Sequence, residues 1–183
     1  SRAKFTVSYP SSFMLVASMN PSPSGYFMND KGLSQSSAME MNRYLNKISG
    51  PLLDRIDLHI EVNPVPFEKL ADKSTAEKSE SIRNRVIHAR AIQSQRFKEY
   101  HGIHYNAQMP TKLISIFCEL DETSLNLLQT AMEKLNLSAR AYDRILKVAR
   151  TIADLETADK IKPQHIAEAI QYRSLDRDLW TNN

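Results

Sequence analysis

The sequence predicts an α+β fold that is mainly α, in which two or three strands come first and an all-helical block follows. The first strand is expected at residues 13–17, a continuous apolar run that is typical of a strand buried on both faces. The second is expected at 56–62, where apolar and polar residues alternate until Pro64 and Pro66 end the pattern. Residues 2–9 are a weaker candidate for a third strand, as one arm of a hairpin.

Helical patterns account for most of the remaining chain. A capping box, Ser37 followed by Glu40, begins a helix that Gly50 is expected to end. After Pro66 we expect helices over 75–100 and 111–120, and further helices that begin at Asp121, at Ser138 and near Pro163. We therefore predict two domains, residues 1–66 with the strands and residues 67–183 with the helices.

Composition and charge permit an anionic partner without requiring one. The 183 residues are 42% hydrophobic and 25% charged, and the net charge of +3 is mildly basic. The single cysteine, Cys118, excludes an internal disulfide framework, and its apolar neighbours predict that it is buried. No apolar run approaches the roughly 18 residues of a membrane span, so we expect a cytoplasmic protein without a membrane partner. Ser1 is not a natural start residue, so we expect a piece of a longer protein.

The helix expected from Ser138 has an apolar face and a basic face. Its basic side chains fall opposite the apolar ones: Arg140, Arg144, Lys147 and Arg150. The last three are expected to lie on a solvated surface. Arg140 differs because it lies in the first turn, where a cation opposes the helix dipole at a cost of ~0.3–1 kcal/mol. A bound phosphate would reverse that sign, so the sequence favours a phosphate-facing role for Arg140.

Two further polar residues lie at the ends of the predicted strands. Arg55 follows a Gly-Pro turn and can either pair with a neighbouring carboxylate or project toward the phosphate of a neighbouring subunit. Asn20 directly follows the first strand and precedes Pro21, which is typical of a ligand-facing strand end or of a simple turn. Sequence spacing does not choose between these alternatives.

Three stretches of the chain resemble magnesium-chelatase-related AAA+ ATPases, specifically the bacterial ComM/YifB branch. FMLVASMNP at 13–21 resembles the sensor-1 strand and loop, ISGPLLDRIDLH at 48–59 the arginine-finger segment, and residues 137–155 the sensor-2 helix. They occur in the family's order and span almost the whole chain. The resemblance implies the C-terminal part of an AAA+ P-loop NTPase α/β core (1–66), followed by a helical lid and magnesium-chelatase-type C-terminal domain (67–183).

The resemblance also implies a role for each site residue. Asn20 would orient the attacking water or read the γ-phosphate of ATP, and Arg140 would contact phosphate within its own subunit. Arg55 would reach the ATP of the adjacent subunit and stabilise transition-state charge in trans. Arg2 and Lys4 would lie on a hairpin that points into the pore of the ring, toward nucleic acid. The full-length protein would be a homohexameric ATPase that binds ATP and Mg²⁺ and drives DNA branch migration as a helicase during competence.

The sequence departs from the family pattern at two places. It contains neither a G-x-x-x-x-G-K-[ST] loop nor an acidic Walker B strand, so we expect no ATPase activity and no bound ATP or Mg²⁺ in this chain alone. Serines stand where the family often has cysteines: Ser22, Ser24, Ser34 and Ser36. Serine supplies no thiolate at neutral pH, and the spacing of His88, His101 and His104 suits no common ligand set, so we expect no metal site.

Two other functions remain open at this point. The same ATP-facing residues would serve a chelatase-type or protein-remodelling motor whose substrate is not DNA. Alternatively, the helical block is a nucleic-acid-binding module without a motor role. Its contact surface would be basic: Arg83, Arg85, Arg90, Arg96 and Lys98. Glutamates dilute the charge of the same helix, so an ordinary solvated face is equally compatible with it.

Overall fold

A computed structural model describes residues 6–9, 11, 13–20, 43, 44, 47, 50–53, 55–62, 65 and 77–173. Contacts divide the chain into two units, Ser1–Ile48 and Ser49–Asn183, and each unit is described by itself. The described residues are mainly helical and form no strand, so the α/β core that the resemblance implies is not seen in this part of the chain. The division into domains at residue 66 stays a prediction.

The strand predicted at 13–17 is not formed in the first unit. Residues 13–20 have no regular secondary structure, and the side chains of Phe13, Met14 and Val16 are 74%, 87% and 81% exposed. An apolar run becomes a strand only where a neighbouring strand takes up its backbone hydrogen bonds. None of the described residues forms such a ladder with 13–17, so the expectation of a strand buried on both faces is wrong for the described structure.

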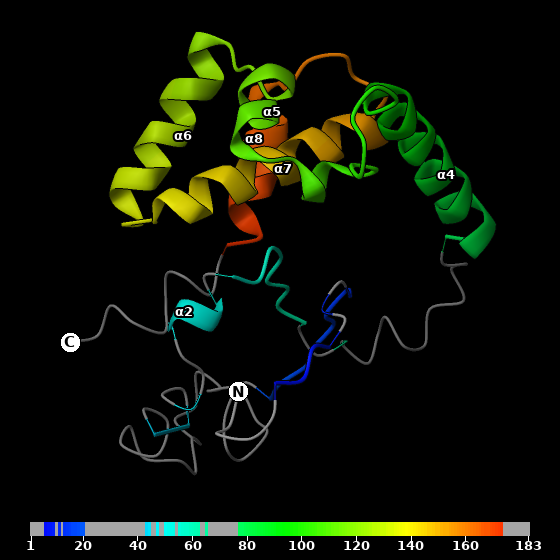
Figure 1. Ribbon diagram of the computed structural model, residues 1–183. Coiled ribbons are helices and arrows are strands. Elements are labelled where there is room, and N and C mark those ends of the chain that lie inside the picture. The colour runs from blue at the N-terminus through cyan, green and yellow to red at the C-terminus, as the bar shows by residue number, and fades with distance from the viewer. Residues whose placement is uncertain are drawn as a thin grey trace. The chain divides into compact units, whose positions relative to one another are not determined.

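Helices build the second unit (Figure 1). In chain order they are α2 (Gly50–Leu53), α4 (Ser79–Arg96), the 3-10 turn η1 (Asn106–Gln108), α5 (Thr111–Phe117), α6 (Glu122–Lys134), α7 (Ala139–Leu155) and α8 (Pro163–Gln171). The helices expected over 75–100 and 111–120, and from Asp121, Ser138 and Pro163, are therefore confirmed. The first two of these end a few residues earlier than expected.

Polar side chains decide where α6 and α7 begin. The Asp121 carboxylate accepts a hydrogen bond from the Ser124 amide (2.7 Å), and the Ser138 hydroxyl accepts one from the Ala141 amide (3.2 Å). Each bond satisfies an amide that the first turn of a helix leaves without a partner in the helix. Both N-caps are those that the sequence predicts.

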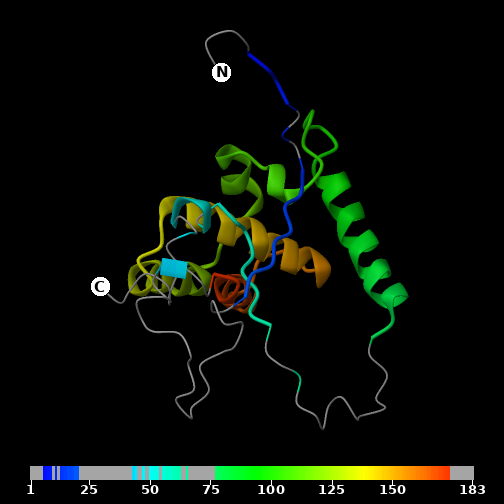
Figure 2. The same ribbon diagram turned by 90° about the horizontal axis from the view of Figure 1, so that it is seen from below.

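The helix α7 runs through the centre of this unit, with α6 and α4 near its opposite ends and α8 crossing it (Figures 1 and 2). One face of α7 is buried along its length: Ala141, Ile145, Leu146, Ala149, Ile152 and Ala153. It packs against buried side chains of α8, among them Ile166 and Ile170. Full burial of one such isoleucine or leucine stabilises the fold by about 1.5–3 kcal/mol. This packing fixes the direction of α7, the helix that carries Arg140.

The second predicted strand, residues 56–62, is also absent. This segment is hydrogen-bonded to the helical unit instead of to a neighbouring strand. Gly50, expected to end a helix, begins the single turn of α2. Farther along, Val62 is 79% exposed and His59 only 5%, so burial in this segment does not follow the apolar alternation. The His59 amide donates to the Tyr172 carbonyl oxygen (2.8 Å), and this bond ties the segment to the end of α8 rather than to a sheet.

Candidate functional site

Arg55 lies in the turn that directly follows α2. Its amide donates to the Leu52 carbonyl oxygen (3.0 Å), and the Ile56 amide donates to the Leu53 carbonyl oxygen (3.0 Å). The Leu53 side chain is buried and anchors the turn, whereas the Arg55 side chain is exposed. The segment therefore presents a guanidinium group at the surface from a well-bonded backbone.

Arg140 lies in the first turn of α7, where the sequence places it. Ser138 is the N-cap, so Arg140 is the second residue of the helix. Its side chain is exposed, and the first turn contains no acidic residue. An exposed cation beside the positive end of a helix attracts an anion, and the residues present therefore fit a phosphate group.

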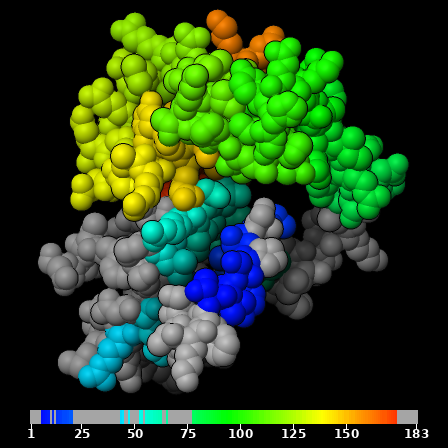
Figure 3. All heavy atoms as spheres, viewed as in Figure 1, coloured from blue at the N-terminus to red at the C-terminus, as the bar shows by residue number. Residues whose placement is uncertain are grey.

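Arg144, one turn farther along α7, joins that helix to the Arg55 segment. Its Nη1 atom donates to the Arg55 carbonyl oxygen (2.8 Å) and to Oδ1 of Asp57 (2.6 Å). In Figure 3 the atoms of residues 50–53 and 55–62, drawn in cyan, lie against the yellow surface of α7. The structure thus brings Arg55 and Arg140, two residues that the sequence singles out, into one unit with a direct link between their elements.

A second link comes from the end of α8. The Arg173 side chain is buried, and its Nη1 atom donates to the Ile56 carbonyl oxygen. In Figure 2 the segment after α2 passes beside α7 and α8. Sequence reasoning missed both arginine links. Arg144 could have been found from the sequence, because its spacing of four from Arg140 places both residues on one helix face. No sequence pattern marks Arg173.

Asn20 belongs to the first unit, whereas Arg55 and Arg140 belong to the second. The backbone carbonyl oxygen of Asn20 accepts a hydrogen bond from the Tyr44 hydroxyl (2.9 Å). The role implied for its side chain stays a prediction. Several other predicted positions lie outside the described residues: Arg2, Lys4, Ser22, Ser24, Ser34 and Ser36.

Arg150 corrects the expectation that the rest of the basic face of α7 is solvated, because it is buried, whereas Arg144 and Lys147 are half-buried. Arg150 is 3% exposed, and it donates to Oδ1 of Asp154 (3.1 Å) and to the Asp159 carbonyl oxygen (2.9 Å). Lys147 donates to the Ala107 carbonyl oxygen (3.0 Å). A helix at the centre of a unit is covered around most of its circumference, and its buried cations then need carboxylate or carbonyl partners.

Two arginines of the alternative basic surface on α4 form ion pairs with carboxylates. Arg96 is mostly buried and binds both carboxylate oxygens of Asp154, at 2.7 and 2.5 Å. Arg85 pairs with Glu77 (2.9 Å). Hydrogen bonds from Ser81 and from Arg85 lower the pKa of Glu77, so this carboxylate stays ionised and offsets the arginine charge.

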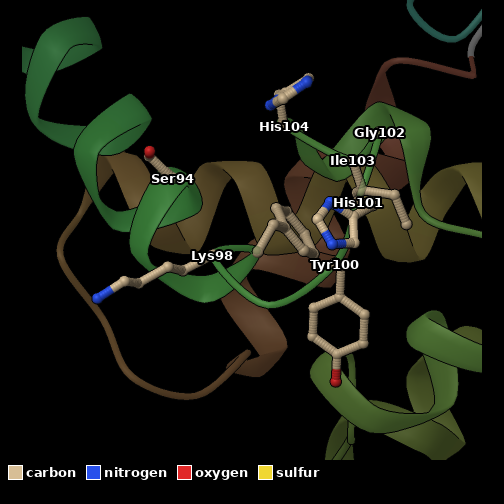
Figure 4. Close-up of a pocket in the computed structure, with 8 residues that line it drawn as sticks. Ser94, Lys98, Tyr100, His101, Gly102, Ile103 and His104 are labelled. Atoms are coloured by element: carbon tan, nitrogen blue, oxygen red, sulfur yellow. The ribbon is translucent and has the colours of Figure 1, made fainter.

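A shallow depression lies at the end of α4, lined in part by Lys98, His101 and His104 (Figure 4). Figure 4 shows the Lys98 and His104 side chains pointing in different directions, so they do not converge on one ligand position. Nearby, the Arg90 guanidinium lies over the Tyr105 ring, 5.0 Å from its centroid, and donates to the Tyr105 hydroxyl (3.0 Å). These contacts describe a surface of helix α4 rather than a binding site.

Metal-ligating side chains do not gather in groups of three or more within the described residues. Cys118 is buried, as the sequence predicts, and burial raises the pKa of its thiol to about 11 in spite of the nearby Arg150 and Arg96 guanidinium groups. A thiol that stays protonated is a poor nucleophile and a poor ligand. Within the described part of the chain, no helix has the length and apolar character needed to cross a membrane.

Family models match both parts of the chain. The model described as magnesium chelatase, subunit ChlI C-terminal, matches residues 76–173, and the model described as magnesium chelatase, subunit ChlI, matches residues 1–70. The match to residues 76–173 covers the helices from α4 to α8, so these helices correspond to the C-terminal domain of that family.

Individual relatives agree with these models. The chain is 42% identical over 180 residues to competence protein ComM of Haemophilus influenzae and 40% identical over 181 residues to the uncharacterised protein YifB of Salmonella typhimurium. An uncharacterised protein of Mycobacterium tuberculosis is 32% identical over 165 residues, which are 90% of this chain and 32% of that relative. The first two alignments cover 98% of this chain but 34% of each relative, so the chain spans about a third of their length. The chain belongs to the magnesium chelatase ChlI family of AAA+ proteins, in the ComM/YifB branch.

Proposed function

We propose that the full-length protein is a ring-forming, ATP-dependent motor that moves DNA as a branch-migration helicase, and that this chain supplies its sensing and triggering residues. Family membership supports the ATP-dependent motor, and a relative named as a competence protein favours DNA as its substrate. The ring would be a homohexamer in the cytoplasm. A chelatase-type or protein-remodelling motor is the alternative that the test below distinguishes.

The observation that carries this proposal is the link that Arg144 makes between the helix of Arg140 and the segment of Arg55. Arg140 stands at a helix N-terminus that fits a phosphate, and the exposed Arg55 lies on a segment bonded to the same helix through Arg144. A subunit built this way has one cation for its own nucleotide and a second for a neighbour's. This arrangement suits a nucleotide that is bound between adjacent subunits of a ring.

ATP and Mg²⁺ would be held largely by the phosphate-binding loop and the Walker B residues, which this sequence does not contain. Bound MgATP would supply the phosphoryl group that is transferred to water. Arg140 would bind the phosphates of its own subunit, Arg55 would stabilise the charge that develops at the adjacent site, and Asn20 would orient the attacking water. Arg2 and Lys4 would contact DNA in the pore.

The experiment that tests the proposal is ATP hydrolysis by the full-length protein, with and without branched DNA. We expect branched DNA to stimulate turnover, and DNA binding to weaken steeply as the salt concentration rises. Turnover that does not respond to DNA would assign the motor to a protein or metal–porphyrin substrate. Absence of turnover would favour the alternative that the helical block is a nucleic-acid-binding module without a motor role.

Arg55→Ala in the full-length protein tests the role of the arginine in trans. We expect turnover to fall by about 10³-fold or more, the usual contribution of such an arginine, with the KM for ATP nearly unchanged. Arg140→Ala is expected to raise the KM for ATP instead, because this residue binds phosphate before the reaction. Lys112→Ala, which removes an exposed cation from α5, serves as the control and should change neither value.

Mixing the two variants separates action in trans from action in cis. A site between an Arg55→Ala subunit that binds ATP and an Arg140→Ala subunit beside it contains both arginines. At an ATP concentration well below the raised KM of Arg140→Ala, mixed rings should therefore recover part of the turnover that neither variant has alone. Arg55→Ala rings with normal turnover, or mixed rings without any recovery, would contradict the assignment of Arg55.

A further inference from the structure

We propose that Arg144 is a positioning residue that couples the phosphate contact of α7 to the arginine segment, residues 55–59. This role rests on the proposed function, because it matters only where Arg55 and Arg140 act on nucleotides. The Arg144 side chain forms the direct link between the helix that carries Arg140 and the backbone of Arg55 itself.

The geometry of this link restrains the segment at two points. A single atom, Nη1 of Arg144, donates to the Arg55 carbonyl oxygen (2.8 Å) and to Oδ1 of Asp57 (2.6 Å), so it bridges both sides of Ile56. The bond to a main-chain oxygen fixes the peptide that follows Arg55, and with it the direction in which the Arg55 side chain leaves the turn. The Asp57 carboxylate holds the guanidinium group in place through a charge-assisted hydrogen bond.

The remaining anchors of the segment lie farther from Arg55. Arg173 donates to the Ile56 carbonyl oxygen, and the His59 amide donates to the Tyr172 carbonyl oxygen (2.8 Å). Both tie the segment to the end of α8, whereas Arg144 alone ties it to α7 among the hydrogen bonds described here. Loss of Arg144 therefore removes this tie between the segment and α7, while the bonds to the end of α8 keep the segment attached to the unit.

The pair is better suited to positioning than to stability. The Asp57 side chain is 57% exposed and that of Arg144 is 23% exposed, and ion pairs at such positions contribute little to the free energy of unfolding. Arg140 and Arg144 are separated by four residues, about 6 Å along one face of the helix. A displacement of the first turn of α7 by a phosphate on Arg140 is therefore passed directly to Arg55.

Turnover by the full-length protein tests this coupling. Arg144→Ala should lower kcat by roughly 10- to 10²-fold, the typical effect of a misplaced catalytic group, and should leave the KM for ATP within about twofold of wild type. Arg144→Lys keeps the charge and a donor on a shorter side chain, so we expect partial recovery. The double variant Arg55→Ala/Arg144→Ala should match Arg55→Ala, because Arg144 acts only through Arg55.

Hydrogen exchange gives a readout that does not depend on activity. In Arg144→Ala we expect faster exchange of the amides at 55–59, with unchanged exchange in α6, where no contact to Arg144 exists among the hydrogen bonds described here. Lys112→Ala is again the control and should leave both regions as in wild type. Unchanged exchange at 55–59 in Arg144→Ala would overturn the proposed restraint.

The outcomes separate this role from the proposed function. An Arg55→Ala protein with full turnover would overturn the proposed function and the role of Arg144 with it. An inactive Arg55→Ala protein beside a fully active Arg144→Ala protein would overturn the positioning role alone. A double variant clearly less active than Arg55→Ala would show that Arg144 acts elsewhere and would also overturn it.

Discussion

Thr157, the residue after the C-cap of α7, has a φ of 57°, in the left-handed region that a β-branched side chain disfavours. The helix end requires this conformation, because the Ala158 amide bonds back to the Ala153 carbonyl oxygen (2.8 Å). Thr157→Gly removes the strain, and we expect it to raise the free energy of unfolding by about 0.5–1 kcal/mol. Urea or thermal unfolding of the chain measures this gain.

Asn136 provides the matched control, because it occupies the same position after α6 with a φ of 47°. Asparagine tolerates the left-handed region better than threonine, so Asn136→Gly should stabilise the chain by less than Thr157→Gly does. Equal gains from the two substitutions would show that side-chain strain at Thr157 is not the cause.

The sequence predicts the environment of some residues of α7 but not of others. The Ser138 cap and the position of Arg140 follow from local chemistry, and the structure confirms both. The burial of Arg150 does not follow, because helical spacing identifies a face but not what covers it. Arg150 is buried because Asp154 lies between it and Arg96, which comes from a helix far away in the sequence.

At the scale of elements, a histidine holds the junction between α7 and α8. His165 is fully buried, and its Nδ1 atom accepts a hydrogen bond from the Lys162 amide (3.0 Å). This bond leaves Nε2 to donate to the Glu156 carboxylate (2.9 Å). The hydrogen bond from His165, aided by one from Gln164, lowers the pKa of Glu156 below its ordinary value of 4.5.

This junction predicts a loss of stability in acid. Because the folded state lowers the pKa of Glu156, its contribution is fully present above the unfolded pKa and disappears as the pH falls through the lower folded value. Glu156→Gln removes the titration, so wild type should be the more stable protein at neutral pH, and the two stability curves should converge below pH 4.5.

Thermal unfolding across this pH range measures the difference, with Glu119→Gln as the control. Glu119 is exposed and close in sequence to neither helix end of the junction, so its variant should follow the wild-type curve throughout. A Glu156→Gln curve that stays parallel to that of wild type down to low pH would contradict the role of the carboxylate.

Helices and strands differ in what the sequence alone can predict. The helices α6, α7 and α8 were predictable because a cap and an apolar stripe with helical spacing are local signals. The strands expected at 13–17 and 56–62 have equally clear patterns, yet a strand also needs a neighbour for its backbone hydrogen bonds. At 56–62 no strand supplies these bonds among the described residues. Instead, the His59 amide donates to the Tyr172 carbonyl oxygen, and the Ile56 carbonyl oxygen accepts from the Arg173 side chain.

At the scale of the whole molecule, the candidate site depends on contacts between distant parts of the chain. Arg144 and Asp57 are 87 residues apart, and Arg173 and Ile56 are 117 residues apart. Motif recognition located Arg55 and Arg140 separately, but their connection requires the fold of the second unit. The position of Asn20 relative to them belongs to the arrangement of the two units and stays a prediction.

The surface of the first unit predicts that this chain self-associates. The side chains of Phe13, Met14 and Val16 are largely exposed, and an apolar run that forms no ladder with the other described residues pairs readily with another copy. We therefore expect sedimentation velocity to show oligomers that grow with protein concentration. Met14→Glu with Val16→Glu should reduce them, because two charges in the run oppose both apolar contact and strand pairing.

Thr6→Glu with Ser8→Glu adds the same charge at exposed positions outside the run, and it separates surface apolarity from net charge. If the exposed run drives association, this control pair should leave most of the oligomers in place. An equal reduction by both pairs would assign the effect to net charge, and a monomeric wild-type chain at every concentration would show that residues 13–17 are covered in solution.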